Sequence, residues 1–160
     1  MTSYYAHINW TRQPHEAFID NHYSRLHQWT FDEGISIPAS SSPHSVPLPL
    51  SVAAAVDPEE ALVAAVASCH MLWFLGIAAK KGFKVNAYTD TPEGIMAKNQ
   101  AHKMAITDIY LRPQVTFSGP KSPDAEMVTK LHDLAHQSCY IANSILATIH
   151  TEGGFSIEAS

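Results

Sequence analysis

Aromatic and polar residues alternate through the first part of the chain. Residues 4–11 and 22–31 follow a near two-residue period, which is typical of half-buried β-strands. A turn at 32–34 leads to a third short strand over 35–39. The next segment, 40–52, holds three prolines within seven residues, and this composition predicts an extended loop rather than a helix or a central strand.

The pattern then changes to an almost wholly apolar run, and the residues around it predict a helix over 58–81. Asp57 is placed to cap this helix, Pro58 takes the first helical position and Glu60 completes a capping box. Two lysines in the last turn, followed by Gly82, mark its end.

A helix that is apolar on every side is either buried all round or lies in a membrane. The nineteen residues from 61 to 79 just reach the length of a bilayer span. They are rich in alanine, however, His70 would lie at mid-bilayer, and strands of soluble type flank the run on both sides. We therefore expect a central buried helix and no membrane partner.

The second half of the chain returns to strand patterns. The expected strands are 83–90, 93–99, 103–119 and 144–150. Between the last two, Ser122-Pro123-Asp124 opens a second helix that runs to about Tyr140, and a frayed polar tail ends the chain. This order predicts an α+β fold, with antiparallel β-sheets packed on two long helices, in one domain over 1–160.

Composition narrows the classes of function. A chain of 160 residues with 46% hydrophobic residues is long enough to bury a core. Its net charge of −5 provides no basic field, which argues against nucleic acid as a partner. The first residues show neither the basic start nor the apolar run of a signal peptide, and only two cysteines are present. We expect a cytoplasmic protein whose cysteines are not a structural disulfide framework.

The two cysteines, Cys69 and Cys139, carry the clearest candidate chemistry. Each is expected in the middle of a helix with its side chain facing inward. One interpretation is that both are small core hydrophobes, since free cysteine is among the most buried residue types. Another is a zinc site, because His132, His136 and Cys139 follow one another at i, i+4 and i+7 and Cys69 supplies a fourth ligand.

A third interpretation is redox chemistry, which needs Cys69 as a thiolate. The helix dipole lowers a thiol pKa only near the first turn, and Cys69 lies eleven residues beyond Pro58. His70 points roughly 100° away around the helix and is a poor direct partner. A cation must therefore come from elsewhere, and the N-terminal strands offer Arg12 and Arg25. Arg25 lies within a predicted strand and between aromatic residues, a position where a charged side chain is expected to serve a specific role.

Three stretches together resemble a known family. They are DPEEALVAAVASCHML, the helix end AKKGFKV and LHDLAHQSCYIANSI. In this order, and with this separation of the two cysteines, they are similar to the OsmC/Ohr family of thiol-dependent hydroperoxide reductases. The resemblance covers about 23–149 and is strongest to a branch in which the first cysteine is followed by His-Met-Leu.

The resemblance implies a domain-swapped, intertwined homodimer with two active sites at the subunit interface. It implies a peroxidase that reduces organic hydroperoxides to alcohols, needs no metal or other cofactor, and is returned to its dithiol form by an external dithiol reductant. Cys69 is then the peroxide-attacking thiolate and Cys139 the resolving thiol, with a disulfide as product. The family's carboxylate after the helix-opening proline corresponds to Glu59, and its activating arginine to Arg25 in preference to Arg12.

Three further residues are candidates to line a substrate pocket: His27, Trp73 and His136. Two alternatives to the peroxidase stay open from the sequence. One is a non-catalytic module of the same fold that senses redox state or binds a ligand. The other is the zinc-binding structural protein described above.

Overall fold

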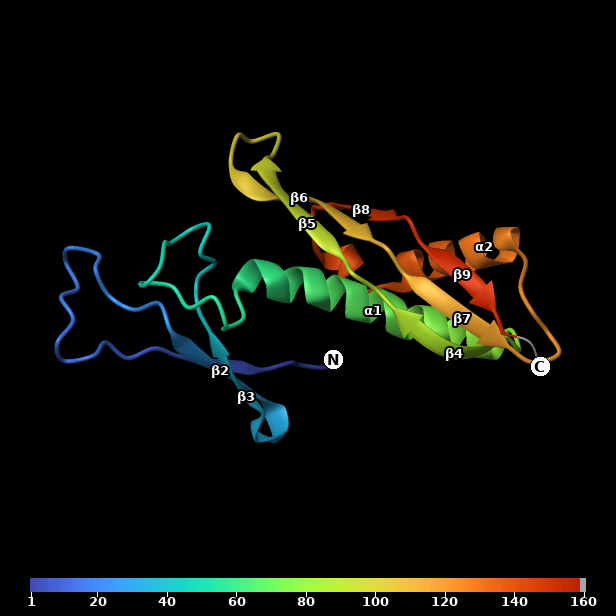
Figure 1. The fold of residues 1–160 in the computed structure, drawn as a ribbon, viewed down its shortest axis with the longest axis horizontal. Coiled ribbons are helices and arrows are strands. Elements are labelled where there is room, and N and C mark those ends of the chain that lie inside the picture. Colours follow the sequence, from blue (N-terminus) through green and yellow to red (C-terminus); the bar gives the residue numbers. More distant parts are fainter. Residues whose placement is uncertain (159–160) are drawn as a thin grey trace. The chain divides into compact units, whose positions relative to one another are not determined.

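The computed structural model describes residues 1–158, which form two compact units, Met1–Ala61 and the chain from Leu62 onward (Figure 1). The long helix α1 (Pro58–Lys80) begins in the first unit and continues through the second. The interpretation of the chain as one OsmC-like domain stays a prediction.

The N-terminal unit is built on a small antiparallel sheet. Its strands are β1 (Ala6–Asn9), β2 (His27–Phe31) and β3 (Ser36–Ala39), in that order across the sheet. The 3-10 turn η1 (Asp32–Gly34) joins β2 to β3 with positive φ values at Glu33 and Gly34. All three strands were expected, but β2 starts at His27. The expectation that Arg25 lies within a strand is therefore wrong, and Arg25 belongs to the loop before it.

The capping signals at the start of α1 are confirmed in detail. The Asp57 carboxylate accepts the backbone N–H of Glu60 at 2.8 Å, and the Glu60 carboxylate accepts the backbone N–H of Asp57 at 3.3 Å. These bonds satisfy backbone donors that a helix leaves unpaired in its first turn. At the other end Gly82 adopts a φ of 80°, the left-handed conformation that glycine accommodates without strain.

Helix α1 is covered along one stripe rather than all round. Its buried residues recur every three or four positions: Val66, Ala67, His70, Phe74 and Ala78. Leu72, on another side, is 63% exposed. The expectation of burial on every side is thus wrong for the single chain, because one layer of strands and one second helix cannot surround an apolar cylinder. By length and composition α1 is also the one helix in residues 1–158 that could cross a membrane.

The second unit holds two three-stranded sheets. One is ordered β4 (Lys84–Thr89), β7 (Gln114–Ser118), β9 (Gly154–Ile157); the other β5 (Glu93–Lys98), β6 (Met104–Leu111), β8 (Thr148–Thr151). The β4–β7 and β5–β6 pairs are antiparallel, whereas β8 and β9 join their sheets in parallel. The α+β class is confirmed, with mixed sheets.

Two strand predictions need correction. The expected strand 103–119 is two strands, because Pro113 has no N–H to donate and the backbone N–H of Arg112 is taken by the Asp90 carboxylate at 2.7 Å. The tail is not frayed: β9 pairs with β7, and the Pro113 carbonyl accepts the N–H of Gly154 at 2.8 Å. The polar sequence did not predict this edge strand, whose Ser156 and Ile157 are both exposed.

The second helix is shorter than expected. Helix α2 covers Ala125–Ser138, with Asp124 as its cap: the Asp124 carboxylate accepts the N–H of Met127 at 2.8 Å. Cys139 follows the helix in an extended conformation (φ −68°, ψ 110°), so the expectation of a mid-helix Cys139 is wrong. The short turn η2 (Ala142–Ser144) then leads to β8.

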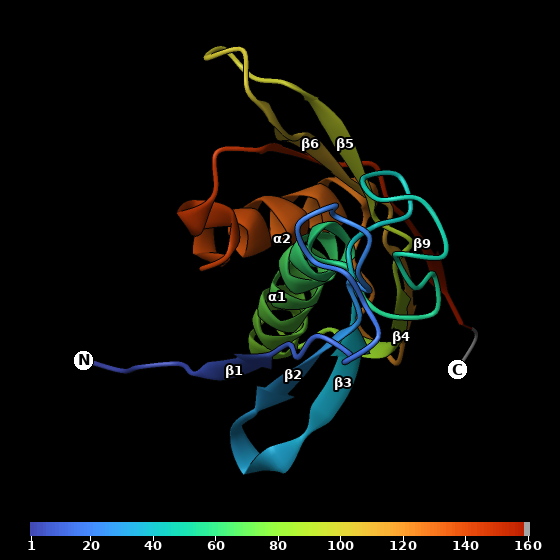
Figure 2. The same cartoon turned by 90° about the vertical axis from the view of Figure 1, so that its left-hand side faces the viewer.

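Both helices of this unit lie on one side of the strands (Figure 2). A cluster of Phe74, Leu131 and Phe117 joins α1, α2 and β7, and a second cluster of Val66 and Ile109 joins α1 to β6. The strands thus form one layer against which the two helices pack. This arrangement positions the site described next.

Candidate active site

The two cysteines meet where α1 passes the end of α2. Cys69 is half-buried on α1, and Cys139 is 0% exposed at the C-terminal cap of α2. Cys69 lies close enough to Cys139 to raise the pKa of its thiol, and both cysteines are free. The Cys139 sulfur also accepts the backbone N–H of Ala142 at 3.4 Å. Two thiols 70 residues apart in sequence are thus neighbours in the fold.

The surroundings of Cys139 favour its protonated form. Burial, followed by the neighbouring Cys69 thiol, raises the pKa of Cys139 from 9.0 to about 11. Cys139 therefore keeps its proton at neutral pH. Cys69 is the more accessible of the pair, so a molecule that approaches from solvent reaches Cys69 first.

Helix α2 ends at Ser138 because the backbone becomes extended at Cys139. The N–H of Cys139 donates to the His136 carbonyl at 3.2 Å, and the N–H of Asn143 donates to the Cys139 carbonyl at 3.0 Å. The next residue, Tyr140, packs edge-on against Trp73 with ring centroids 5.4 Å apart. These contacts hold the second cysteine beside α1.

A pair of buried histidines links the same two helices. His70, next to Cys69, and His132 of α2 are 1% and 7% exposed, and Nε2 of His70 lies 3.0 Å from Nδ1 of His132. Their rings are stacked, and the His132 ring also stacks on Phe74 with centroids 4.3 Å apart. Burial lowers the pKa of each histidine from 6.5 to about 4, so both are neutral at physiological pH.

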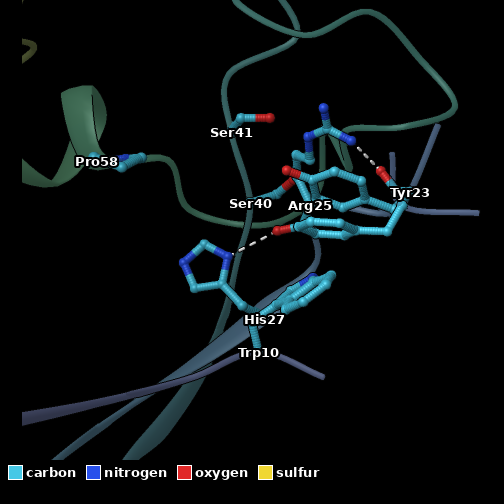
Figure 3. Close-up of a pocket in the computed structure, with 8 residues that line it drawn as sticks. Trp10, Tyr23, Arg25, His27, Ser40, Ser41 and Pro58 are labelled. Carbon is cyan, nitrogen blue, oxygen red and sulfur yellow. Dashed lines mark hydrogen bonds between the residues drawn. The ribbon is translucent and has the colours of Figure 1, made fainter. Parts of the chain in front are cut away.

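A separate pocket of about 480 Å³ lies in the N-terminal unit (Figure 3). Its wall is mainly aromatic, from Trp10, Phe18 and Tyr23, whose rings pack against one another at 4.8–6.0 Å. Arg25 and His27 add the polar groups. An apolar wall with a few polar groups is the usual character of a site for a small organic molecule.

Arg25 is held at this pocket by its neighbours. Its guanidinium lies over the Tyr23 ring, 3.7 Å from the centroid, and donates to the carbonyl of Tyr23 (Figure 3). It also donates to the Asn21 carbonyl at 3.1 Å and to the Asn21 side-chain oxygen at 2.7 Å. Arg12, by contrast, is exposed and donates to the carbonyls of Gln13 and Glu16.

The two hydrogen bonds of His27 assign its ring hydrogen to Nδ1. Its Nδ1–H donates to the Arg25 carbonyl at 2.8 Å, while its Nε2 accepts the indole N–H of Trp29 at 2.8 Å. A ring nitrogen that accepts cannot carry a proton, so this arrangement fixes one tautomer. His27 braces the backbone of Arg25 from the strand that follows it.

A family model described as "OsmC-like protein" matches residues 51–152. The chain belongs to the OsmC-like family. Among solved structures, an OsmC-like protein of unknown function from Vibrio cholerae O1 biovar eltor str. N16961 is 53% identical, covering 96% of this chain and 99% of its own, with a TM-score of 0.94. No curated protein matches.

Two more distant solved structures share the fold. An organic hydroperoxide resistance protein from Elizabethkingia anophelis is 14% identical over 98% of this chain and 99% of its own, with a TM-score of 0.63. Another from Legionella pneumophila is 13% identical over 98% of each chain, with a TM-score of 0.64. The resemblance to the OsmC/Ohr family is thus confirmed. The assignment to the branch with Ser-Cys-His-Met-Leu stays a prediction.

The sequence-derived candidates of this OsmC-like protein fall into four places. Cys69 and Cys139 are neighbours, and Trp73 packs against Tyr140, the residue after Cys139. Arg25 and His27 share the N-terminal pocket. Glu59 is half-buried in the first turn of α1, and His136 is exposed on α2.

The geometry does not favour the zinc interpretation for this OsmC-like chain. Because α2 ends at Ser138, Cys139 leaves the helical face that carries His132 and His136. His132 is bonded to His70, and His136 is exposed. Over residues 1–158 there is no group of three His, Cys, Asp or Glu side chains placed to hold a metal ion.

Two features of the site were missed from the sequence. The histidine pair was missed because His70 was weighed only as a partner for Cys69; its burial in an apolar helix is the signal that another polar group must meet it. Phe18 was missed because it lies in a polar loop with no periodic pattern around it.

Proposed function

We propose that this OsmC-like protein is a cysteine-based peroxidase of the cytoplasm that reduces organic hydroperoxides to alcohols. The observation that carries the proposal is that the accessible Cys69 thiol is the neighbour of the buried, protonated Cys139 thiol. One partly accessible thiol beside one protected thiol is the arrangement that a two-step thiol peroxidase needs.

In the first step the Cys69 thiolate attacks the outer oxygen of the hydroperoxide. A sulfur–oxygen bond forms, the oxygen–oxygen bond breaks, and the leaving alkoxide takes a proton to become the alcohol. Cys69 is thereby oxidised by two electrons to a sulfenic acid.

In the second step Cys139 resolves the sulfenic acid. Its sulfur attacks the Cys69 sulfur, the sulfur–oxygen bond breaks, and water leaves with the thiol proton. The high pKa of Cys139 keeps this thiol from competing for peroxide, because the thiolate is the reactive form. An external dithiol then reduces the disulfide by two electrons and completes the cycle.

The thiolate of Cys69 needs a cation, and Arg25 is our proposed source. A guanidinium held in place stabilises both the thiolate and the developing alkoxide. The Arg25 guanidinium uses three of its five N–H groups on Asn21 and Tyr23, which leaves two N–H groups to donate further hydrogen bonds. Glu59 is our proposed partner for this arginine, since a carboxylate pairs with both arms of a guanidinium.

The functional form is proposed to be an intertwined homodimer. In the N-terminal unit the buried hydrophobic residues are only Ala39 and Ala55. Large apolar side chains there are exposed instead, among them Tyr4, Tyr5, Ile8, Phe18 and Ile19. A three-stranded sheet with so little core has marginal stability alone, and a second chain that covers it supports its fold.

The apolar part of the hydroperoxide is proposed to bind against the aromatic wall of the N-terminal pocket, with His27 on its rim. Trp73 and His136 are proposed to line the side of the site nearer the cysteines. Aromatic walls favour organic hydroperoxides over hydrogen peroxide, which offers no apolar surface to bury.

The test is peroxide consumption with tert-butyl hydroperoxide and with hydrogen peroxide, by wild type, Cys69→Ser and Cys139→Ser, with a dithiol as reductant. Cys69→Ser is expected to consume none. Cys139→Ser, measured without the dithiol, is its matched control: it reduces the first equivalent and stops at the sulfenic acid, identified by mass. Full activity of Cys69→Ser, or stable thiols in wild type after one equivalent, contradicts the peroxidase and favours the non-catalytic module.

A further inference from the structure

We propose that the buried hydrogen bond between His70 and His132 is a positioning element that sets the register of α1 against α2, and thereby the approach of Cys69 to Cys139. The two histidines touch neither substrate nor the reacting sulfur atoms in this role; they act through the cysteines. The effect of the histidine pair on catalysis rests on the proposed peroxidase. Its effect on the register of the two helices can be tested without peroxide.

The histidines lie close to the cysteines along both helices. His70 follows Cys69 directly, and His132 lies two turns before Cys139. The link between them joins residues 62 positions apart at 3.0 Å, with ring planes 13° from parallel. A shift of either helix along its axis therefore changes the histidine bond and the distance between the thiols together.

The pair is not explained by stability alone. Two neutral imidazoles carry one N–H each, and only one of these can lie in the shared bond. Nδ1 of His70 and Nε2 of His132 are buried and have no hydrogen-bond partner within the described chain. Buried polar atoms without partners are costly, and two apolar residues of similar size would fill the space at less cost.

The His70–His132 hydrogen bond is directional and constrains sliding of α1 along α2 more than the surrounding apolar packing does. The neighbouring contacts of α1 with α2 come from apolar residues such as Phe74 and Leu131, and apolar contact constrains sliding only weakly. Buried polar pairs are used elsewhere to fix the register of packed helices. A shift by one helical turn moves a residue by about 5.4 Å, which exceeds the range over which two cysteines can bond.

The chain offers conservative substitutions that separate the hydrogen bond from the imidazole. The amide nitrogen of glutamine occupies the place of Nε2, and an asparagine amide occupies the place of Nδ1. His70→Gln and His132→Asn therefore keep a bonding atom where the structure uses one. His70→Leu and His132→Leu remove it, and the double leucine variant removes both polar groups without leaving either unpaired.

The first measurement is closure of the Cys69–Cys139 disulfide in mixtures of reduced and oxidised glutathione. Glutathione disulfide takes up two electrons from the protein dithiol and gives two glutathione thiols, so no peroxide is involved. The equilibrium constant is expected to fall about tenfold in the leucine variants, including the double variant, and to stay within about twofold of wild type in His70→Gln and His132→Asn. Gln137→Ala, an exposed change on α2, is the matched control.

The second measurement is the single-turnover reaction with tert-butyl hydroperoxide. Loss of hydroperoxide by Cys69 is expected at the wild-type rate in every histidine variant, while conversion of the sulfenic acid to the disulfide slows about tenfold in the leucine variants. If the double leucine variant folds and closes the disulfide as readily as wild type, the positioning role is wrong. If wild type closes with glutathione but does not react with hydroperoxide, the proposed peroxidase fails and the positioning role stands.

Discussion

The guanidinium of Arg25 lies over the ring of Tyr23, with its Cζ atom 3.7 Å from the ring centroid. This stacking, together with the bonds to Asn21, holds the charge of Arg25 in one orientation on the aromatic pocket. Arg12 has no comparable setting, since it is exposed and bonded to neighbouring carbonyls. The structure therefore adds a reason to prefer Arg25 as the activating cation.

We predict that Arg25→Lys lowers the second-order rate of Cys69 with tert-butyl hydroperoxide about 100-fold. Lysine keeps the charge but has neither the planar face that stacks on Tyr23 nor the fork that donates two parallel hydrogen bonds. Stopped-flow measurement of peroxide loss checks this. Arg12→Lys serves as the control and is expected to stay within about twofold of wild type; a larger loss in Arg12→Lys than in Arg25→Lys would assign the role to Arg12.

The environment of the two thiols predicts a fixed order of alkylation. Cys139 is fully buried and its pKa is raised to about 11, so about one molecule in several thousand carries its thiolate at pH 7.5. Cys69 is half-buried. Iodoacetamide is expected to label Cys69 first, with Cys139 at least tenfold slower, as followed by peptide mass spectrometry. Labelling of Cys139 ahead of Cys69 in the folded protein would contradict the assigned roles.

The elements that local chemistry specifies were predictable. Asp57 and Glu60 cap α1, and Gly82 ends it, because each interaction involves residues within one turn. The separation of β6 from β7 was less visible, since Pro113 breaks a strand pattern that is otherwise continuous. The strand β9 depends on its pairing with β7, about 40 residues earlier, and no local pattern in a polar tail indicates that pairing.

The same distinction applies to the site. Both cysteines were identified, but their proximity depends on how α1 and α2 pack, and on Cys139 leaving the helix at its cap. The partnership of His70 with His132 likewise spans 62 residues. Helical spacing within α2 instead suggested that His132 belongs with His136, although the first of these is buried and the second exposed.

The first turn of α1 offers a way to separate stability from catalysis. Asp57→Ala removes the side chain that accepts the N–H of Glu60 and is expected to lower the free energy of unfolding by about 1 kcal/mol. The adjacent Glu59 makes no such capping bond in the described structure, so Glu59→Gln is expected to leave unfolding within about 0.5 kcal/mol of wild type while slowing peroxide reduction. Urea unfolding and peroxide assays on both variants check this. Equal peroxide rates in wild type and Glu59→Gln would remove Glu59 from the site.

The histidine pair predicts that the protein loses stability in mild acid. Burial lowers the pKa of His70 and of His132 from 6.5 to about 4; the nearby His132 and His136 lower that of His70 further, while Asp133 acts in the opposite direction on His132. Between these pH values the unfolded chain binds protons that the folded chain excludes. The free energy of unfolding therefore decreases as the pH falls from 6.5 towards 4, by up to about 1.4 kcal/mol per pH unit for each histidine.

Urea unfolding at half-unit steps from pH 7.5 to 4.5 measures this slope. The double variant His70→Leu, His132→Leu is expected to lose most of the decrease between pH 6.5 and 5, because neither leucine takes up a proton in the unfolded state. His22→Ala, which removes an exposed histidine, controls for histidine content and is expected to keep the wild-type slope. Since the carboxylates titrate mainly below this range, an unchanged slope in the double variant would mean that other groups account for the acid sensitivity and that the buried pair does not exclude protons.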